Sequence, residues 1–287
     1  MKVIAITKVF NEEHFLESWL NQVLSFCDTA ILYDDGSTDR TNEILHKYLP
    51  DDHIIRNDVN DPANETAHCN LLMQRIHDLN LNPDWIFTNS IDEYLPANLT
   101  PQVIHSRLED LDKKGIGIAY MKNAELYLHP HYMRLDNLWG LVAFVRFYKY
   151  KNSLIINDST GGSPHSSVHP PEIFKWKRTS WSERMLHFGY LEKERILRRF
   201  DTMIKCYEEG SFGHHYHYAN WVRTLDLRTW KISHIPNIWL KDNCDQECTP
   251  YIPEGNWLIS PEDTFRWKYI EKFGLHINPP VKLDSGL

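Results

Sequence analysis

The first part of the chain alternates short apolar runs with longer stretches of helical periodicity. Runs rich in β-branched or aromatic residues predict strands at 2–9, 29–33, 53–56, 85–88 and 116–121. Between them, apolar residues recur every three or four positions and predict helices after residue 11, up to 45, over 63–79 and over 100–112. Strictly alternating strands and helices imply parallel strands joined by right-handed crossovers, and hence a three-layer α/β sheet.

Polar residues mark where three of these helices are expected to begin. Asn11 can cap the first helix, and Ser37 or Thr38 the second, after a tight turn that Gly36 permits. Thr100 precedes a proline at the first position of the last helix, which is a common helix start.

Acidic residues follow two of the predicted strands. Asp34 and Asp35 come after the strand at 29–33, and Asp92 and Glu93 come shortly after the strand at 85–88. Parallel strands place both turns on one edge of the sheet, where ligands of open α/β sheets bind. Carboxylates repel an anionic ligand there unless a divalent cation lies between them, so the second turn suggests a metal that bridges protein and phosphate. Solvated loop acids in the second turn, and a purely structural Asx-turn in the first, are the alternatives.

Composition and charge narrow the class of protein. The chain is 42% hydrophobic and 24% charged, as in ordinary globular proteins. A formal charge of −8 disfavours nucleic acid and anionic membrane surfaces as partners. No apolar run is long enough to span a bilayer, and the first residues lack the length and cleavage site of a signal peptide. The five scattered cysteines read as reduced thiols, so we expect a cytoplasmic protein.

Three segments carry a resemblance to a known family. Residues 3–13 resemble the opening strand and Asn-Glu turn of family 2 glycosyltransferases, and the Asp-Asp-Gly-Ser-Thr-Asp string within 33–41 is similar to their nucleotide-binding signature. Residues 89–93 lie where such enzymes carry an Asp-x-Asp metal motif. The resemblance covers about residues 1–95. It implies a GT-A type three-layer sandwich with a mostly parallel central sheet. It also implies inverting transfer of a sugar from a UDP- or GDP-sugar to a saccharide or glycan hydroxyl, often with Mn²⁺ or Mg²⁺.

The resemblance also implies roles for single residues. Asp35 would accept a hydrogen bond from the nucleobase, Asp34 would support the turn, and Asp92 would be the metal-binding second acid of the motif. The first acid of that motif is replaced by Ser90, which brings no charge and leaves Glu93 as the neighbouring substitute ligand. Further contacts to the donor are expected from Thr7, Val9, Asn11, Ser90 and Ile91.

The second half of the chain is expected to carry the acceptor side. Residues 141–150 alternate and predict one long antiparallel strand, and 157–171 form a loop by composition. This loop offers a general base for the acceptor hydroxyl. Asp158 fits the chemistry of related enzymes, His165 has an ordinary pKa nearer neutrality, and His169 and Glu172 stay open as alternatives.

A histidine on the predicted strand at 185–190 is the candidate for a third metal ligand. His187 resembles the late histidine that many GT-A enzymes use, and an imidazole with a carboxylate and phosphate oxygens suits Mn²⁺. The alternative is a histidine that donates to a backbone carbonyl beside the sheet. Helices are predicted over 192–208 and after residue 260.

These patterns give an expected organisation. We expect a catalytic core at 1–190, divided into a nucleotide-binding half at 1–95 and an acceptor half at 96–190. A mainly helical extension at 191–287 would pack on the core or, in a homo-oligomer, on a partner subunit. Two other functions stay open: an inactive nucleotide-sugar or carbohydrate-binding homologue, suggested by Ser90, and a nucleotidyltransferase, whose glycine-rich loop is missing from 8–12.

Overall fold

The computed structural model describes most of the chain, in two compact units. The described residues are 1–61, 65–135, 142–154, 169–208, 225–226, 231–240 and 258–272. The first unit comprises 1–123, 143–187 and 237–243, and the second comprises 124–142, 188–236 and 244–287. Strands β6 (Ile118–Tyr127) and β9 (Arg178–Tyr190) run from the first unit into the second.

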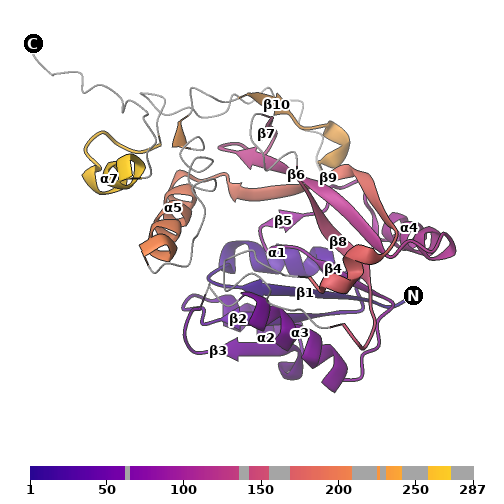
Figure 1. Cartoon of the computed structure of the whole chain (residues 1–287). Helices are drawn as coiled ribbons and strands as arrows, with labels where there is room; N and C mark the ends of the chain where they lie inside the picture. The colour runs from indigo at the N-terminus through magenta and orange to yellow at the C-terminus, as the bar shows by residue number, and fades with distance from the viewer. Residues whose placement is uncertain are drawn as a thin grey trace, which may run out of the picture. The chain divides into compact units, whose positions relative to one another are not determined.

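Four parallel strands form the centre of the first unit, as the alternating pattern predicts. Their spatial order is β3 (Ile54–Asn57), β2 (Thr29–Asp35), β1 (Val3–Val9) and β4 (Trp85–Thr88) (Figure 1). Each strand holds hydrophobic residues on both faces, because helices cover both sides of a parallel sheet. The predicted α/β class with a mostly parallel central sheet is therefore confirmed.

The continuation of the sheet corrects one prediction. The strand predicted at 116–121 is β6, but its pairing with β8 is antiparallel. Instead β8 (Ala143–Lys149), the predicted antiparallel strand, lies between β4 and β6 and pairs with both. The local pattern marked β6 as a strand, whereas its partner came from a segment later in the chain. β5 (Glu93–Tyr94) pairs antiparallel with β9, which also pairs with β6.

Helices cover the two faces of this sheet separately. Val3 and Ala5 of β1 pack in one core with Leu16, Leu45 and Leu108. Ile4 and Ile6 point to the other face and pack with Leu72 and Ile76. The first core is therefore covered by α1 (Glu13–Val23), α2 (Thr41–Tyr48) and α4 (Pro101–Lys113), and the second by α3 (Glu65–Asp78).

Two predicted helix caps are wrong. The N-cap positions of α1 and α2 are Glu12 and Arg40, and neither has a side-chain cap hydrogen bond. Asn11 adopts a left-handed backbone, with φ of 52°, and its Oδ1 accepts from the Thr38 amide at 2.8 Å. The predicted capping residues thus tie the two turns together instead of capping their own helices. The cap at Thr100 is confirmed, since its hydroxyl accepts from the Val103 amide.

The second unit has its own core. Helices α5 (Lys193–Glu208) and α7 (Thr264–Lys272) contribute Ile196, Phe200, Trp267 and Ile270 to one apolar cluster. Strand β7 (Tyr132–Arg134) pairs antiparallel with β10 (Ile232–His234). The mainly helical extension at 191–287 stays a prediction, because much of that range lies outside the described residues.

Three short 3-10 helices complete the described elements: η1 (Asp51–His53), η2 (Pro171–Lys175) and η4 (Asn237–Trp239). Among the helices that the structure describes, none has the length and apolar character that crossing a membrane requires.

Candidate functional site

The two acidic turns lie at the same edge of the sheet, as predicted. In the β1–β2 register Val9 is opposite Asp34, and in the β1–β4 register Ile6 is opposite Thr88. All three strands run in the same direction, so the ends of β2 and β4 that lead into the acidic residues flank the end of β1. This is the edge at which open α/β sheets bind their ligands.

Asp34 occupies a structural position at the end of β2. It belongs to the strand, not to a turn after it, and it is fully buried. Its Oδ1 accepts from the Ser37 amide at 2.9 Å, and its Oδ2 lies 3.5 Å from Arg56 Nη1. The hydrogen bond to Ser37 holds the chain as it leaves the strand, and the role of Asp34 in a nucleotide site stays a prediction.

Asp35 points to the opposite face of the sheet and is held by the segment after β3. Its Oδ2 accepts from Asn60 Nδ2 at 2.9 Å and its Oδ1 accepts from the Asp61 amide at 3.0 Å. Lys8 Nζ lies 3.9 Å from Oδ2. Gly36 allows this close approach, because a Cβ there would lie 2.9 Å from the Asn60 backbone nitrogen. A nucleobase that bonds to Asp35 must therefore share or displace these partners.

Aromatic side chains that the sequence interpretation missed lie on the same face as Asp35. The rings of Tyr33 and His68 stack with centroids 4.1 Å apart. His68 Nδ1 is buried and has no hydrogen-bond partner within the described part of the chain. Burial and the nearby Lys8 ammonium lower the pKa of His68, and burial and the Asp35 carboxylate raise the pKa of Tyr33. The sequence signal that could have indicated this cluster was Lys8, a charged residue within the largely apolar strand β1.

Asp92 and His187, the predicted metal ligands, lie side by side. His187 Nε2 is 3.4 Å from Asp92 Oδ2, and both side chains are largely buried. The antiparallel pairing of β5 and β9 brings Asp92 and His187 together, because Glu93 of β5 is opposite His187 of β9. Two ligands that are each about 2.1 Å from one ion are about 3.0–3.4 Å apart, so this spacing suits a shared divalent cation.

The pair of Asp92 and His187 offers two side chains that suit a metal ion. Among the described residues, no group of three or more His, Cys, Asp or Glu side chains is arranged for a metal. A carboxylate and an imidazole fit a cation whose remaining positions are filled by phosphate oxygens.

Glu93, the predicted substitute ligand, is engaged elsewhere. Arg146 donates to both of its oxygens, at 2.7 and 2.8 Å, and Asn123 Nδ2 and the Ser90 amide donate to one oxygen each. Burial by itself raises the pKa of Glu93, but the Arg146 guanidinium, His187 and the Ser90 amide hold it below its usual value. The structure therefore places Glu93 in a buried ion pair and not beside Asp92 as a ligand.

The predicted donor contacts divide into three groups. Val9 and Ile91 are 2% exposed and pack in the core on the α1 side. Thr7 is buried, and its hydroxyl donates to the Asn89 carbonyl at 2.6 Å, which joins β1 to the turn after β4. Asn11 and Ser90 are exposed at the binding edge.

Of the four candidate bases, the structure describes His169 and Glu172. His169 is partly buried, and its Nε2 lies 3.2 Å from the hydroxyl of Thr88 at the end of β4. Burial and the Arg146 guanidinium lower the pKa of His169 to about 4. Asp158 and His165 lie outside the described residues. Glu172 is exposed in η2.

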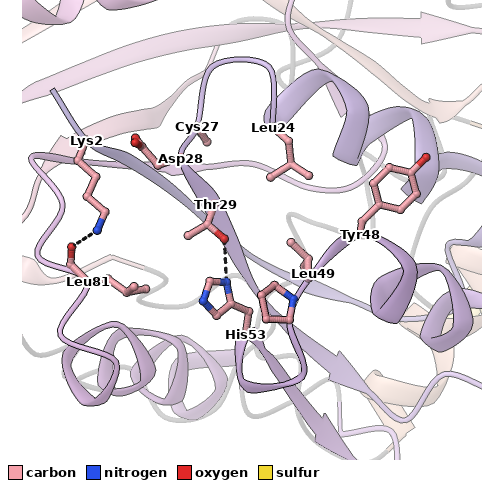
Figure 2. A pocket seen from close by; sticks show the side chains of 10 residues that line it. Lys2, Leu24, Cys27, Asp28, Thr29, Tyr48, Leu49, His53 and Leu81 are labelled. Atoms are coloured by element: carbon pink, nitrogen blue, oxygen red, sulfur yellow. Dashed lines mark hydrogen bonds between the residues drawn. The ribbon is translucent and has the colours of Figure 1, made fainter.

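A hollow of about 650 Å³ lies at the other end of the parallel strands (Figure 2). Lys2 and Thr29, at the amino ends of β1 and β2, line it together with His53. Thr29 Oγ1 and His53 Nδ1 form a hydrogen bond of 2.7 Å within it. Because the acidic residues lie past the opposite strand ends, we do not assign this hollow to the candidate site.

Known proteins resemble the chain in part. Residues 4–65 match the family model described as Glycosyl transferase family 2. No curated protein matches the chain. Among solved structures, residues 1–349 of S. aureus TarS in complex with UDP are 17% identical, with a TM-score of 0.34 over 43% of this chain and 36% of that chain.

A second similar structure is glucosyl-3-phosphoglycerate synthase from Mycobacterium tuberculosis. In complex with Mg²⁺ and UDP it is 16% identical, with a TM-score of 0.28 over 41% of this chain and 42% of that chain. In complex with Mn²⁺, UDP and glucosyl-3-phosphoglycerate it is 16% identical, with a TM-score of 0.30 over 44% and 47%. The matched part thus spans less than half the length of each of these chains. The part of the chain that is similar to glycosyl transferase family 2 is thus the segment at 4–65, which contains β1, α1, β2, α2 and β3.

Proposed function

We propose that the protein is a glycosyltransferase that moves a sugar from a UDP- or GDP-sugar to the hydroxyl of a saccharide or glycan acceptor, with inversion. The observation that supports this proposal is the contact between Asp92, which follows β4, and His187 of β9, because a carboxylate and an imidazole at this spacing suit a shared divalent cation. β4 is the direct neighbour of β1 in the family 2 segment.

The chain's own residues would divide the work of donor binding. Asp92 and His187 would hold Mn²⁺ or Mg²⁺ against the diphosphate. When bound, such an ion stabilises the negative charge of the departing nucleoside diphosphate. Asp35 would bind the nucleobase edge, and Lys8, 3.9 Å from it, would orient this carboxylate.

A general base has to take the proton of the acceptor hydroxyl. His169 is held by Thr88 at the end of β4, and its lowered pKa keeps the imidazole neutral near pH 7. A pKa of about 4 also makes it a weak base, so Asp158 and His165 remain candidates of equal standing. Replacing each by Ala and measuring turnover at saturating donor identifies the base, because only its loss lowers the rate by more than about tenfold.

The organisation and location of the protein belong to the same proposal. The core at 1–190 would bind donor and acceptor, and the extension at 191–287 would pack on it or on a second copy. Cys27 and Cys69 are free thiols, which supports a cytoplasmic protein.

One observation favours a second function, that of a nucleotide-sugar-binding protein without transferase activity. Ser90 leaves Asp92 without a second local acid, because Glu93 is committed to Arg146. Release of UDP or GDP from donor sugars in the presence of Mn²⁺ would argue against this alternative.

A thermal-shift screen of UDP- and GDP-sugars, with and without Mn²⁺, tests the proposed function. A ligand present at about 100 times its dissociation constant stabilises the folded state by about 2.7 kcal/mol, which is a measurable shift. We expect one nucleotide class to raise the melting temperature, and more so with Mn²⁺. No shift with any nucleotide sugar would contradict the proposal.

A further inference from the structure

A buried network of hydrogen-bonded polar side chains includes Glu93, the residue that follows Asp92. Glu93, Arg146 and Asn123 are 5%, 4% and 3% exposed. Arg146 donates through Nη1 to Glu93 Oε2 at 2.7 Å and through Nη2 to Oε1 at 2.8 Å. Asn123 joins both partners, since its Nδ2 donates to Oε1 at 2.7 Å and its Oδ1 accepts from Arg146 Nη2 at 2.6 Å. The network therefore connects β5, β6 and β8.

The same carboxylate also fixes the turn that carries Asp92. The Ser90 amide donates to Glu93 Oε2 at 2.8 Å, and the Glu93 amide donates back to the Ser90 carbonyl at 3.1 Å. Asn89 Nδ2 donates to the Glu93 carbonyl at 2.6 Å, while Trp19 Nε1 donates to Asn89 Oδ1 at 3.1 Å. These hydrogen bonds hold the residues that precede and follow Asp92 in the chain.

Both oxygens of Glu93 have their full number of donors. A carboxylate has about four lone-pair sites, and here each oxygen accepts two hydrogen bonds. A cation could bind Glu93 only if it displaced Arg146 or its companions, and a bidentate pair with arginine is among the strongest polar contacts in proteins.

We infer that Glu93 is a positioning residue, which together with Arg146 and Asn123 holds the turn at 89–92 so that the Asp92 carboxylate faces His187. The inference rests on the proposed function, in which Asp92 and His187 hold the cation of the donor complex. Outer partners of metal ligands typically change metal affinity by about 10- to 100-fold when they are removed. The pair with Arg146 therefore controls the affinity for the metal–diphosphate complex without touching it.

The test uses Glu93→Gln and Arg146→Met, because the two roles of Glu93 predict opposite results for the second variant. If Glu93 positions Asp92, each variant weakens binding of UDP (or GDP) with Mn²⁺ by at least about tenfold in calorimetry. If Glu93 is itself a ligand, Arg146→Met frees its carboxylate, and binding stays the same or becomes tighter. The second result would overturn the inference.

The chain offers a matched control pair. Arg107 donates to both oxygens of Glu183, at 2.8 and 2.7 Å, in the same unit but outside the turn. We expect Arg107→Met and Glu183→Gln to leave nucleotide binding within about twofold of the unmodified protein. An equal loss in both pairs would mean that binding follows general stability, and the inference would fail.

A second readout does not depend on the ligand. Exchange of the Ser90 and Glu93 amide hydrogens is expected to speed up at least about tenfold in Glu93→Gln and Arg146→Met but not in the control pair. If Arg146→Met does not fold, Asn123→Ala removes two hydrogen bonds of the network and is measured in its place. Absence of nucleotide binding by the unmodified protein would refute the proposed function, and the exchange rates alone would then decide the inference. Unchanged exchange in the folded variants would overturn it.

Discussion

His187 Nε2 lies 3.4 Å from Asp92 Oδ2, although one residue follows the fourth parallel strand and the other belongs to a late antiparallel strand. The contact exists because β5 and β9 pair in a register that sets Glu93 opposite His187. In the proposed function, this carboxylate and imidazole would supply two ligands of a divalent cation, and the diphosphate of the donor would supply oxygen ligands.

Replacement of Asp92 should remove metal-dependent donor binding. Asp92→Asn keeps the shape of the side chain but takes away its charge, so we expect the affinity for UDP (or GDP) with Mn²⁺ to fall by on the order of 100-fold. The measurement is calorimetric titration with and without Mn²⁺. Glu109→Gln removes a carboxylate from the exposed face of α4 and serves as the control. Unchanged binding in Asp92→Asn would show that the cation is held elsewhere.

The side chain of Asn60 is expected to compete with the nucleobase for Asp35. Asn60 Nδ2 donates to Asp35 Oδ2 at 2.9 Å. A hydrogen bond to a charged group contributes about 1.5–3 kcal/mol, so removal of this one corresponds to about a 10- to 150-fold change in affinity. Asn60→Ala should therefore tighten nucleotide binding by this factor, whereas Asp35→Ala should weaken it. If Asn60→Ala weakens binding as strongly as Asp35→Ala does, Asn60 orients the carboxylate instead of competing for it.

The pKa of His169 makes the protein less stable in acid. Its pKa is lowered from 6.5 to about 4, so the unfolded chain binds a proton between these values that the folded protein does not bind. The free energy of unfolding therefore falls as the pH drops from about 6.5 to about 4, by up to about 3 kcal/mol from this residue. Chemical denaturation at several pH values should show a smaller loss in His169→Gln. His14→Gln, at an exposed histidine, measures the effect of removing an imidazole from the surface. Equal slopes in the unmodified protein and His169→Gln would contradict this assignment.

A side chain at Gly36 should disturb the binding edge. Gly36 has φ of +78°, and a Cβ there would lie 2.9 Å from the Asn60 backbone nitrogen and 3.0 Å from the Val59 carbonyl carbon. Gly36→Ala is expected to cost about 2–4 kcal/mol, from backbone strain together with a clash that only backbone movement relieves.

Gly115 provides the matched comparison for this prediction. Its φ is +65°, but a Cβ there would meet no atom within 4 Å. Gly115→Ala should cost about 1 kcal/mol, from backbone strain alone. Urea unfolding of both variants separates the two contributions, and equal losses would mean that the segment at 59–60 moves freely away from Gly36.

The sequence by itself determined the order of the elements in the nucleotide-binding half. Strands with apolar residues on both faces and helices with an apolar stripe have different periods, and their alternation requires parallel strands with crossovers. That rule alone put Asp35 and Asp92 on one edge of the sheet. The resemblance to family 2 glycosyltransferases then indicated His187 as a partner of Asp92.

Only the tertiary structure decided what each of these side chains does. Glu93 and Asp92 are adjacent in the chain and chemically alike, yet Glu93 meets Arg146 of β8 while Asp92 meets His187 of β9. The placement of β8 between β4 and β6 likewise had no local signal, because a strand's partners depend on which distant segments complete its buried faces and hydrogen bonds. Local periodicity fixes which element a residue belongs to. Contacts between segments that are far apart in the sequence make Asp92 a candidate ligand and place Glu93 in a buried ion pair.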